Sequence, residues 1–229
     1  MTAQMRRKTG NSTDPIILAL PKGRILPEVM PLLTRAGIRV EPDFDNDRSR
    51  KLRFQTNIAG LTVVRVRSFD VATFVAFGAA HLGVAGSDVL MEFDYPELYA
   101  PIDLGVGRCR IAVAEPKELV ANDDPSRWSH VRVATKYPET ARRYFATRGV
   151  QAECIALSGA MELAPQLGLC TRIVDLVQTG ATLKANGLAE IETIAEVSAR
   201  LVVNRTALKL HPEAIGELVS RIQEAVDAA

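Results

Sequence analysis

Short apolar runs alternate with stretches of helical periodicity along nearly the whole chain, and this alternation limits the possible folds more than any other feature. A short apolar run is typical of a buried strand, whereas apolar residues at the helical repeat are typical of an amphipathic helix. Strands that alternate with helices favour an α/β fold with parallel sheets. We expect strands at residues 16–20, 61–66, 81–86, 106–114, 131–134, 153–157, 173–177 and 196–203, and helices at 25–36, 71–80, 87–92, 138–149, 158–168 and from 211 onward.

Two polar breaks, near Gly105 and Ala189, divide the chain into a predicted pair of lobes. We expect domain I to comprise residues 16–105 and 190–229, so that the last strand and helix return to the first lobe. Domain II then comprises residues 106–189. A cleft between the lobes would be lined by the turns that follow the strands. Residues 1–15 are polar and basic, and we expect them to form a flexible tail.

The segment 172–188 is the one place where the sequence indicates a specific chemistry. An apolar strand carries Asp175 near its end, and Thr179-Gly180-Ala181-Thr182 follows directly. Glycine allows the backbone to approach a ligand closely, and the free N–H groups of a following helix favour an anion such as phosphate. A carboxylate upstream of this loop would accept hydrogen bonds from the hydroxyls of a phosphorylated sugar. The motif alone fits an ordinary turn capped by threonine equally well.

Cationic side chains follow two of the predicted strands and also occur in a charged loop at residues 43–53. The first turn carries a glycine, Gly23, between two cations, at the place where ligands usually bind in open α/β sheets. Guanidinium and ammonium groups suit phosphate oxygens, although each group taken alone fits a solvated surface charge as well. The candidate anion-binding residues are Lys22, Arg24, Arg50, Lys51 and Arg67.

The overall charge gives no sign of a nucleic-acid or membrane partner. The formal net charge is +1, so any affinity for phosphate must be local. The N-terminus lacks the apolar stretch of a secretory signal, and no run of apolar residues reaches the ~20 that a bilayer requires. Three widely spaced cysteines fit reduced thiols better than a disulfide framework or a zinc site. We therefore expect a cytoplasmic protein.

Several motifs occur in a fixed order along the chain, and together they resemble the ATP phosphoribosyltransferase family over roughly residues 16–204. An ordered series of motifs is more specific than any one of them. The motifs are LPKGR (20–24), the turn at 67–70, GVAGSDVL (83–90), GRCRIAVA (107–114), ATKYP (134–138), SGAMELAP (158–165) and IVDLVQTGATLKANGL (173–188).

The resemblance implies a fold, a reaction and a cofactor. The fold would be a two-lobed α/β arrangement with a central cleft, like the type II periplasmic binding proteins. The reaction would transfer the 5-phosphoribosyl group of phosphoribosyl pyrophosphate to N1 of ATP, which releases pyrophosphate in the first step of histidine biosynthesis. The resemblance also implies Mg²⁺, which we expect to be bound mainly through substrate phosphates rather than at a dedicated protein site.

The resemblance also assigns roles to the candidate residues. The loop of Thr179, Gly180, Ala181, Thr182 and Leu183 would hold the 5-phosphate, and Asp175 would lie beside the ribose. Glu162, with Asp175, would orient ribose hydroxyls or help to hold the magnesium ion. Because phosphoribosyl transfer depends on positioning and electrostatics, the cations Lys22, Arg24, Arg50, Lys51 and Arg67 would bind pyrophosphate and the triphosphate of ATP.

The length of the chain resembles the short form of this family. That form implies a homodimer within a hetero-oligomer, in which a regulatory subunit resembling histidyl-tRNA synthetase supports activity. Two other functions remain open from the residues. One is a phosphoribosyltransferase that acts on a free base, but such enzymes usually carry two adjacent acids where Asp175 stands beside Leu176. The other is a solute receptor, which is normally exported, whereas this chain shows no signal peptide.

Overall fold

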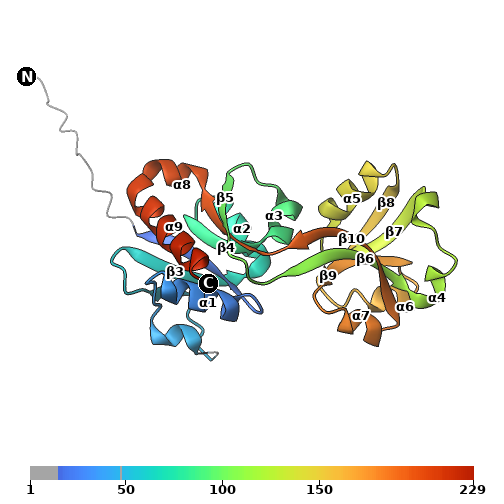
Figure 1. Cartoon of the computed structure of the whole chain (residues 1–229), viewed down its shortest axis with the longest axis horizontal. Helices are drawn as coiled ribbons and strands as arrows, with labels where there is room; N and C mark the ends of the chain where they lie inside the picture. The colour runs from blue at the N-terminus through green and yellow to red at the C-terminus, as the bar shows by residue number, and fades with distance from the viewer. Residues whose placement is uncertain (1–14, 47) are drawn as a thin grey trace, which may run out of the picture.

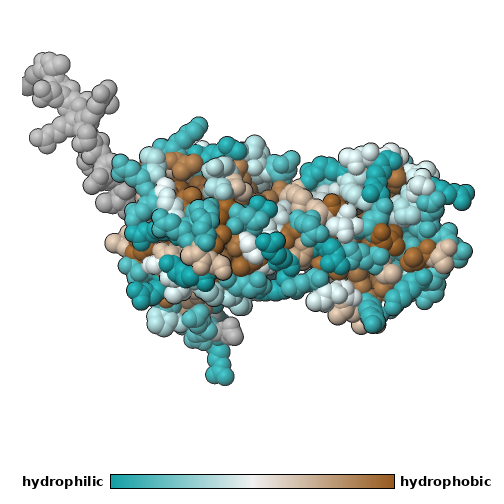
Figure 2. Space-filling model, in the orientation of Figure 1, coloured by the Kyte–Doolittle hydropathy of each residue, from teal (hydrophilic) through white to brown (hydrophobic). Residues whose placement is uncertain are grey.

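The computed structural model describes residues 15–46 and 48–229, which form two lobes joined by two extended strands (Figure 1). The predicted flexible tail falls largely outside the described residues. The space-filling view narrows between the lobes, and hydrophilic residues cover most of the face it shows (Figure 2). Among the described residues, no helix combines the length and the apolar character needed to cross a membrane.

The first lobe is built on a six-stranded sheet with the strand order β2-β3-β1-β4-β11-β5. Strands β3, β1 and β4 pair in parallel at its centre, while β2, β11 and β5 are antiparallel to their neighbours. The elements are β1 (Ile16–Lys22), α1 (Leu26–Arg35), η1 (Pro42–Asp45), β2 (Arg53–Gln55), β3 (Leu61–Arg67), α2 (Ser68–Ala76), β4 (Leu82–Gly86), α3 (Ser87–Phe93), β5 (Leu98–Asp103), β11 (Ala199–Asn204), α8 (Arg205–Leu210) and α9 (Pro212–Asp227).

The second lobe is built on a five-stranded sheet with the order β10-β6-β9-β7-β8. Strands β9, β7 and β8 are parallel, and β6 is antiparallel to both of its neighbours. The elements are β6 (Cys109–Pro116), α4 (Lys117–Val120), η2 (Pro125–Arg127), β7 (His130–Thr135), α5 (Pro138–Thr147), β8 (Gln151–Ala156), α6 (Leu163–Gln166), β9 (Arg172–Val177), α7 (Ala181–Ala185) and β10 (Leu188–Val197).

The two-lobed α/β fold predicted from the sequence is confirmed, with one difference in sheet type. Each sheet has a parallel part, but antiparallel strands extend it, so both sheets are mixed rather than purely parallel. The parallel parts matter for function because the carboxyl ends of β1 and β3, and of β7 and β9, open toward loops where ligands bind in such sheets.

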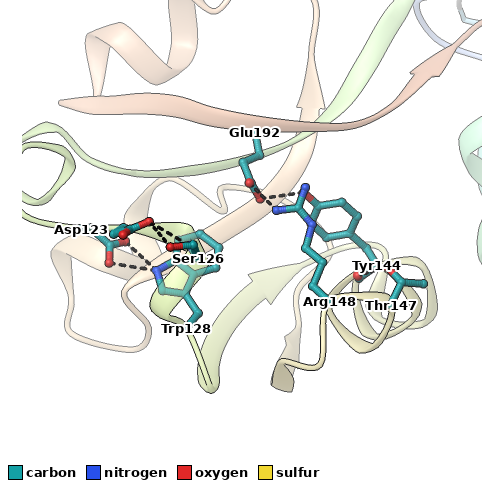
Figure 3. Close-up of polar contacts among 8 residues, drawn as sticks. Asp123, Ser126, Trp128, Tyr144, Thr147, Arg148 and Glu192 are labelled. Carbon is teal, nitrogen blue, oxygen red and sulfur yellow. Dashed lines mark hydrogen bonds and ion pairs between the residues drawn. The ribbon is translucent and has the colours of Figure 1, made fainter.

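Strand β10 belongs to the second sheet, whereas the sequence prediction placed residues 190–229 in the first lobe. It pairs with β6 along its length, and only Ser198 separates it from β11 of the other sheet. Glu192 of β10 also binds helix α5 of the second lobe, because its carboxylate accepts a hydrogen bond of 2.6 Å from the Tyr144 hydroxyl and pairs with Arg148 (Figure 3). The single strand predicted at residues 196–203 therefore spans a change of sheet.

Helices α3 and α5 form a contact between the lobes. The Glu92 carboxylate of α3 accepts hydrogen bonds of 2.9 Å from the backbone N–H groups of Glu139 and Thr140, and another of 2.9 Å from the Thr140 hydroxyl. It thus caps the N-terminus of α5, a contact that typically contributes about 1 kcal/mol. One turn earlier, Asp88 accepts a hydrogen bond of 2.8 Å from the Tyr137 hydroxyl. We call Asp88, Glu92, Tyr137 and Thr140, all buried, the interlobe clasp.

Candidate active site

A pocket of about 210 Å³ surrounds the loop that follows β9. Gly180 has a φ of 74° in this loop, a left-handed conformation that glycine adopts without strain. The Thr179 hydroxyl accepts a hydrogen bond of 3.3 Å from the Ala181 N–H, which shapes the turn into α7. We call this the phosphate pocket. All of the predicted second-lobe site residues line it: Glu162, Asp175, Thr179, Gly180, Ala181, Thr182 and Leu183.

Asp175 provides a half-buried carboxylate on the wall of the phosphate pocket. Its Oδ1 atom accepts a hydrogen bond of 2.8 Å from the Leu176 N–H. Burial is the main cause that raises the pKa of Asp175 to about 6, and the negative charge of Glu162 adds to the rise, while the Lys136 ammonium opposes it. The carboxylate is therefore ionised at neutral pH, but it becomes protonated at mildly acidic pH.

A larger cleft of about 620 Å³ lies between the lobes. We call it the interlobe cleft. A smaller inner pocket of about 150 Å³ continues it toward the phosphate pocket, since Leu176 lines both the inner pocket and the phosphate pocket. The first lobe contributes Lys22, Arg67, Ser68, Phe69, Asp70, Glu92 and Phe93 to the interlobe cleft, and the second contributes Lys136, Pro138, Ala156, Leu157 and Ser158.

Three of the predicted cations meet at the interlobe cleft and the inner pocket. Lys22 and Arg67 end neighbouring parallel strands and are register partners, so their side chains enter the same cleft. Gly23, with a φ of 101°, turns the chain after Lys22. Arg24 lines the inner pocket and donates a 3.5 Å hydrogen bond to the Cys109 sulfur. The predicted cationic turns therefore converge from separate parts of the sequence.

Arg50 and Lys51 are not brought together with these residues. Both are exposed in the segment between η1 and β2, and neither lines the phosphate pocket, the interlobe cleft or the inner pocket. The Lys51 ammonium lies 2.6 Å from the Glu41 carboxylate and 5.6 Å from the centre of the Phe54 ring. The roles assigned to Arg50 and Lys51 remain predictions.

Sequence reasoning gave no role to several residues that the fold places at the cleft, above all Lys136. This lysine directly follows β7, and Lys22 is the last residue of β1, so the same pattern of a cation at the end of a strand was present in the sequence. Asp88 lies in the first turn of α3, and its carboxylate binds Tyr137 of the other lobe. Burial raises the pKa of the Asp88 carboxyl, which the Tyr137 hydroxyl partly offsets. Only the tertiary structure brings these two residues together.

The chain is similar to known proteins over most of its length. The sequence model of the family described as HisG: ATP phosphoribosyltransferase matches residues 67–224. An ATP phosphoribosyltransferase of Paramagnetospirillum magneticum is 67% identical over 212 residues, which cover 93% of this chain and 97% of that protein. The chain belongs to the ATP phosphoribosyltransferase family. Members of this family transfer a phosphoribosyl group from phosphoribosyl pyrophosphate to ATP, the first step of histidine biosynthesis.

Solved structures agree on the fold. The complex titled ATP phosphoribosyl transferase (HisG:HisZ) from Thermotoga maritima contains a chain that matches with a TM-score of 0.79 and 31% identity, over 93% of this chain and 100% of that one. The periplasmic aliphatic sulphonate binding protein SsuA from Escherichia coli matches with a TM-score of 0.54 and 13% identity, over 93% of this chain and 72% of that one. The second likeness concerns the fold alone, which confirms the predicted resemblance to periplasmic binding proteins.

Proposed function

We propose that the phosphate pocket binds the 5-phosphoribosyl group and that the cations of the interlobe cleft bind the polyphosphates of the two substrates. One observation carries the proposal: residues predicted from two separate stretches of sequence, Glu162 in the first and Asp175 with the loop at 179–183 in the second, line one pocket. The loop would hold the 5-phosphate through its N–H groups and threonine hydroxyls, and Asp175 would accept hydrogen bonds from ribose hydroxyls.

The proposed mechanism is electrostatic. As the bond between C1 of the ribose and the pyrophosphate oxygen breaks, positive charge develops on the ribose and negative charge on the pyrophosphate, and N1 of adenine forms the new bond to C1. Lys22, Arg24 and Arg67 would stabilise the developing negative charge, since fixed cations in a cleft need little reorganisation. Asp175, beside the ribose, would stabilise the positive charge.

We propose Mg²⁺ as the divalent metal of the reaction. No group of three or more histidine, cysteine or acidic side chains within residues 15–46 and 48–229 is placed to hold a metal. Asp175 and Glu162 line the phosphate pocket, and this donor set fits an ion that takes one or two carboxylates and completes its shell with substrate phosphates. Bound there, the ion would neutralise phosphate charge and fix the geometry of the pyrophosphate.

We also propose that the chain acts in the cytoplasm, as a homodimer within a hetero-oligomer. A subunit of the HisZ type, resembling histidyl-tRNA synthetase, would be its regulatory partner. The matched Thermotoga maritima chain belongs to a complex titled HisG:HisZ, and the Paramagnetospirillum relative is matched over 97% of its length, as expected for the short form.

An assay of the purified chain tests this proposal. With ATP, phosphoribosyl pyrophosphate and Mg²⁺, product absorbance is expected to rise faster once a HisZ-type subunit is added, because that subunit would stabilise the active assembly. Omission of Mg²⁺ is expected to abolish the signal. An equal rate with and without the subunit would contradict the proposed partner, and an undiminished rate in chelator would contradict the metal.

Thr182→Val tests the phosphate pocket itself. Valine keeps the shape of the side chain but removes a hydroxyl that would donate a hydrogen bond to a charged phosphate, a loss of about 1.5–3 kcal/mol. We expect the dissociation constant for phosphoribosyl pyrophosphate to rise by about tenfold or more, with little change for ATP. Thr206→Val, on exposed helix α8, is the matched control. Unaltered binding of the sugar phosphate to the Thr182 variant would refute the assignment.

A further inference from the structure

Lys136 occupies a short loop that both lobes hold in place. The loop joins β7 to α5, and the residues on either side of Lys136 are buried, with exposed fractions of 0% for Thr135 and 2% for Tyr137. The Thr135 hydroxyl accepts a hydrogen bond of 2.9 Å from the Tyr137 N–H, and the Tyr137 hydroxyl binds Asp88 of the first lobe. The interlobe clasp therefore fixes the backbone on which Lys136 is carried.

The half-buried side chain of Lys136 lines both the interlobe cleft and the inner pocket. Its ammonium nitrogen lies 3.9 Å from the centre of the Phe69 ring, which belongs to the first lobe. Within the described part of the chain, no ion pair involves Lys136, in contrast to Lys51, which pairs with Glu41. A contact between an ammonium and an aromatic ring is weaker than a hydrogen bond between an ammonium and an anion. The Lys136 ammonium can therefore leave the Phe69 ring to bind an anionic ligand.

The charges of the interlobe cleft favour an anion that touches both lobes. Lys22 and Arg67 approach from the first lobe, and Lys136 approaches from the second. Of the two acids on the cleft wall, Glu92 is occupied by hydrogen bonds of the clasp, and Asp70 lies in the first turn of α2. An anion in the cleft would therefore meet cations on opposite walls.

We propose that Lys136 is a substrate-binding residue whose ammonium donates hydrogen bonds to a polyphosphate in the interlobe cleft, opposite Lys22 and Arg67. The inference rests on the proposed function and extends it to a residue of the other lobe. Two ligands share this chemistry, the pyrophosphate group of the sugar substrate and the triphosphate of ATP. If Lys136 binds the pyrophosphate group, the electron pair of the broken C1–O bond leaves on a pyrophosphate oxygen whose negative charge Lys136 helps to neutralise.

Titration calorimetry with the full-length chain tests the proposal directly. We expect Lys136→Met to weaken binding of inorganic pyrophosphate or of tripolyphosphate by about tenfold or more, as for loss of a charge-assisted hydrogen bond, and Lys136→Arg to restore most of it. The polyphosphate that loses affinity identifies the ligand, and a matching rise in KM for phosphoribosyl pyrophosphate or for ATP confirms it. Lys117→Met, an exposed lysine of the same lobe, is the control.

The outcomes separate this proposal from the proposed function. If the unaltered chain binds pyrophosphate but forms no product with its regulatory subunit, the proposed function fails, while weaker binding by Lys136→Met still supports the role of Lys136. If product forms and Lys136→Met keeps the affinity and the KM values of the unaltered chain, the role of Lys136 is overturned. Lys136→Gln, checked by circular dichroism, serves as the neutral variant should the methionine variant misfold.

Discussion

Arg67→Ala is expected to lower kcat/KM by about 10²–10³ while the far-ultraviolet circular dichroism spectrum stays unchanged. Arg67 ends β3, and its exposed side chain lines the interlobe cleft beside Lys22. Because it is exposed, its removal leaves no buried partner unsatisfied, so the fold should survive. Loss of one fixed donor to a developing charge typically costs about 10²–10³ in rate, and Arg67 would face the pyrophosphate as it acquires charge.

Initial rates over a range of both substrates provide the measurement, and Arg221→Ala provides the control. Arg221 is also exposed, but it lies on α9 and pairs with Glu217 one turn away, so its loss should leave the rate within about twofold and cost only a few tenths of a kcal/mol. Unchanged kinetics for Arg67→Ala would remove this residue from the site. Loss of the far-ultraviolet dichroism signal in Arg67→Ala would instead indicate that Arg67 has a structural role.

The α/β architecture could be predicted from sequence because each strand–turn–helix unit carries its own local signals. Strand β1 is an almost fully buried run, and α1 follows with Val29, Leu32 and Leu33 on one face. Strands β5 and β2 were missed, since β5 is largely exposed and β2 is very short. The predicted helix at 158–168 is reduced to the short α6, because residues 158–162 form an irregular loop in which Ala160 has a φ of 53°.

The phosphate pocket was predictable for the same reason, since most of its wall is one continuous stretch from Asp175 to Leu183. The interlobe cleft was less predictable from the sequence, because its two walls come from lobes whose relative position depends on the interlobe clasp and on β10. The sequence around Lys136 gives no sign that the ammonium of this lysine lies over the ring of Phe69, which is far away in sequence. In the same way, nothing in the charge pattern distinguished Lys51, paired with Glu41, from Lys22 in the cleft.

Asp175→Asn is expected to stabilise the fold and to abolish most of the activity. Burial raises the pKa of this carboxyl from 3.8 to about 6, so the folded protein holds the proton more tightly than the unfolded chain does. The free energy of unfolding then falls as pH rises from about 4 to 6. Because one pKa unit corresponds to about 1.4 kcal/mol, the ionised carboxylate lowers this free energy by about 3 kcal/mol at pH 8. Asparagine carries no charge, and its Oδ1 can keep the Leu176 hydrogen bond.

Urea denaturation and initial rates together test whether Asp175→Asn raises the stability and lowers the activity. At pH 8 the Asp175→Asn variant should unfold at a higher urea concentration than the unaltered chain, and the difference should close as the pH falls toward 4. Its kcat/KM should drop by about 10² or more, because the carboxylate no longer accepts the ribose hydroxyls or faces the positive ribose with a charge. Asp227→Asn, exposed at the end of α9, should change neither quantity. If Asp175→Asn instead lowers the stability at pH 8, the carboxylate supports the fold rather than the reaction. A charge that the folded state disfavours is expected only where the charged group is placed for chemistry.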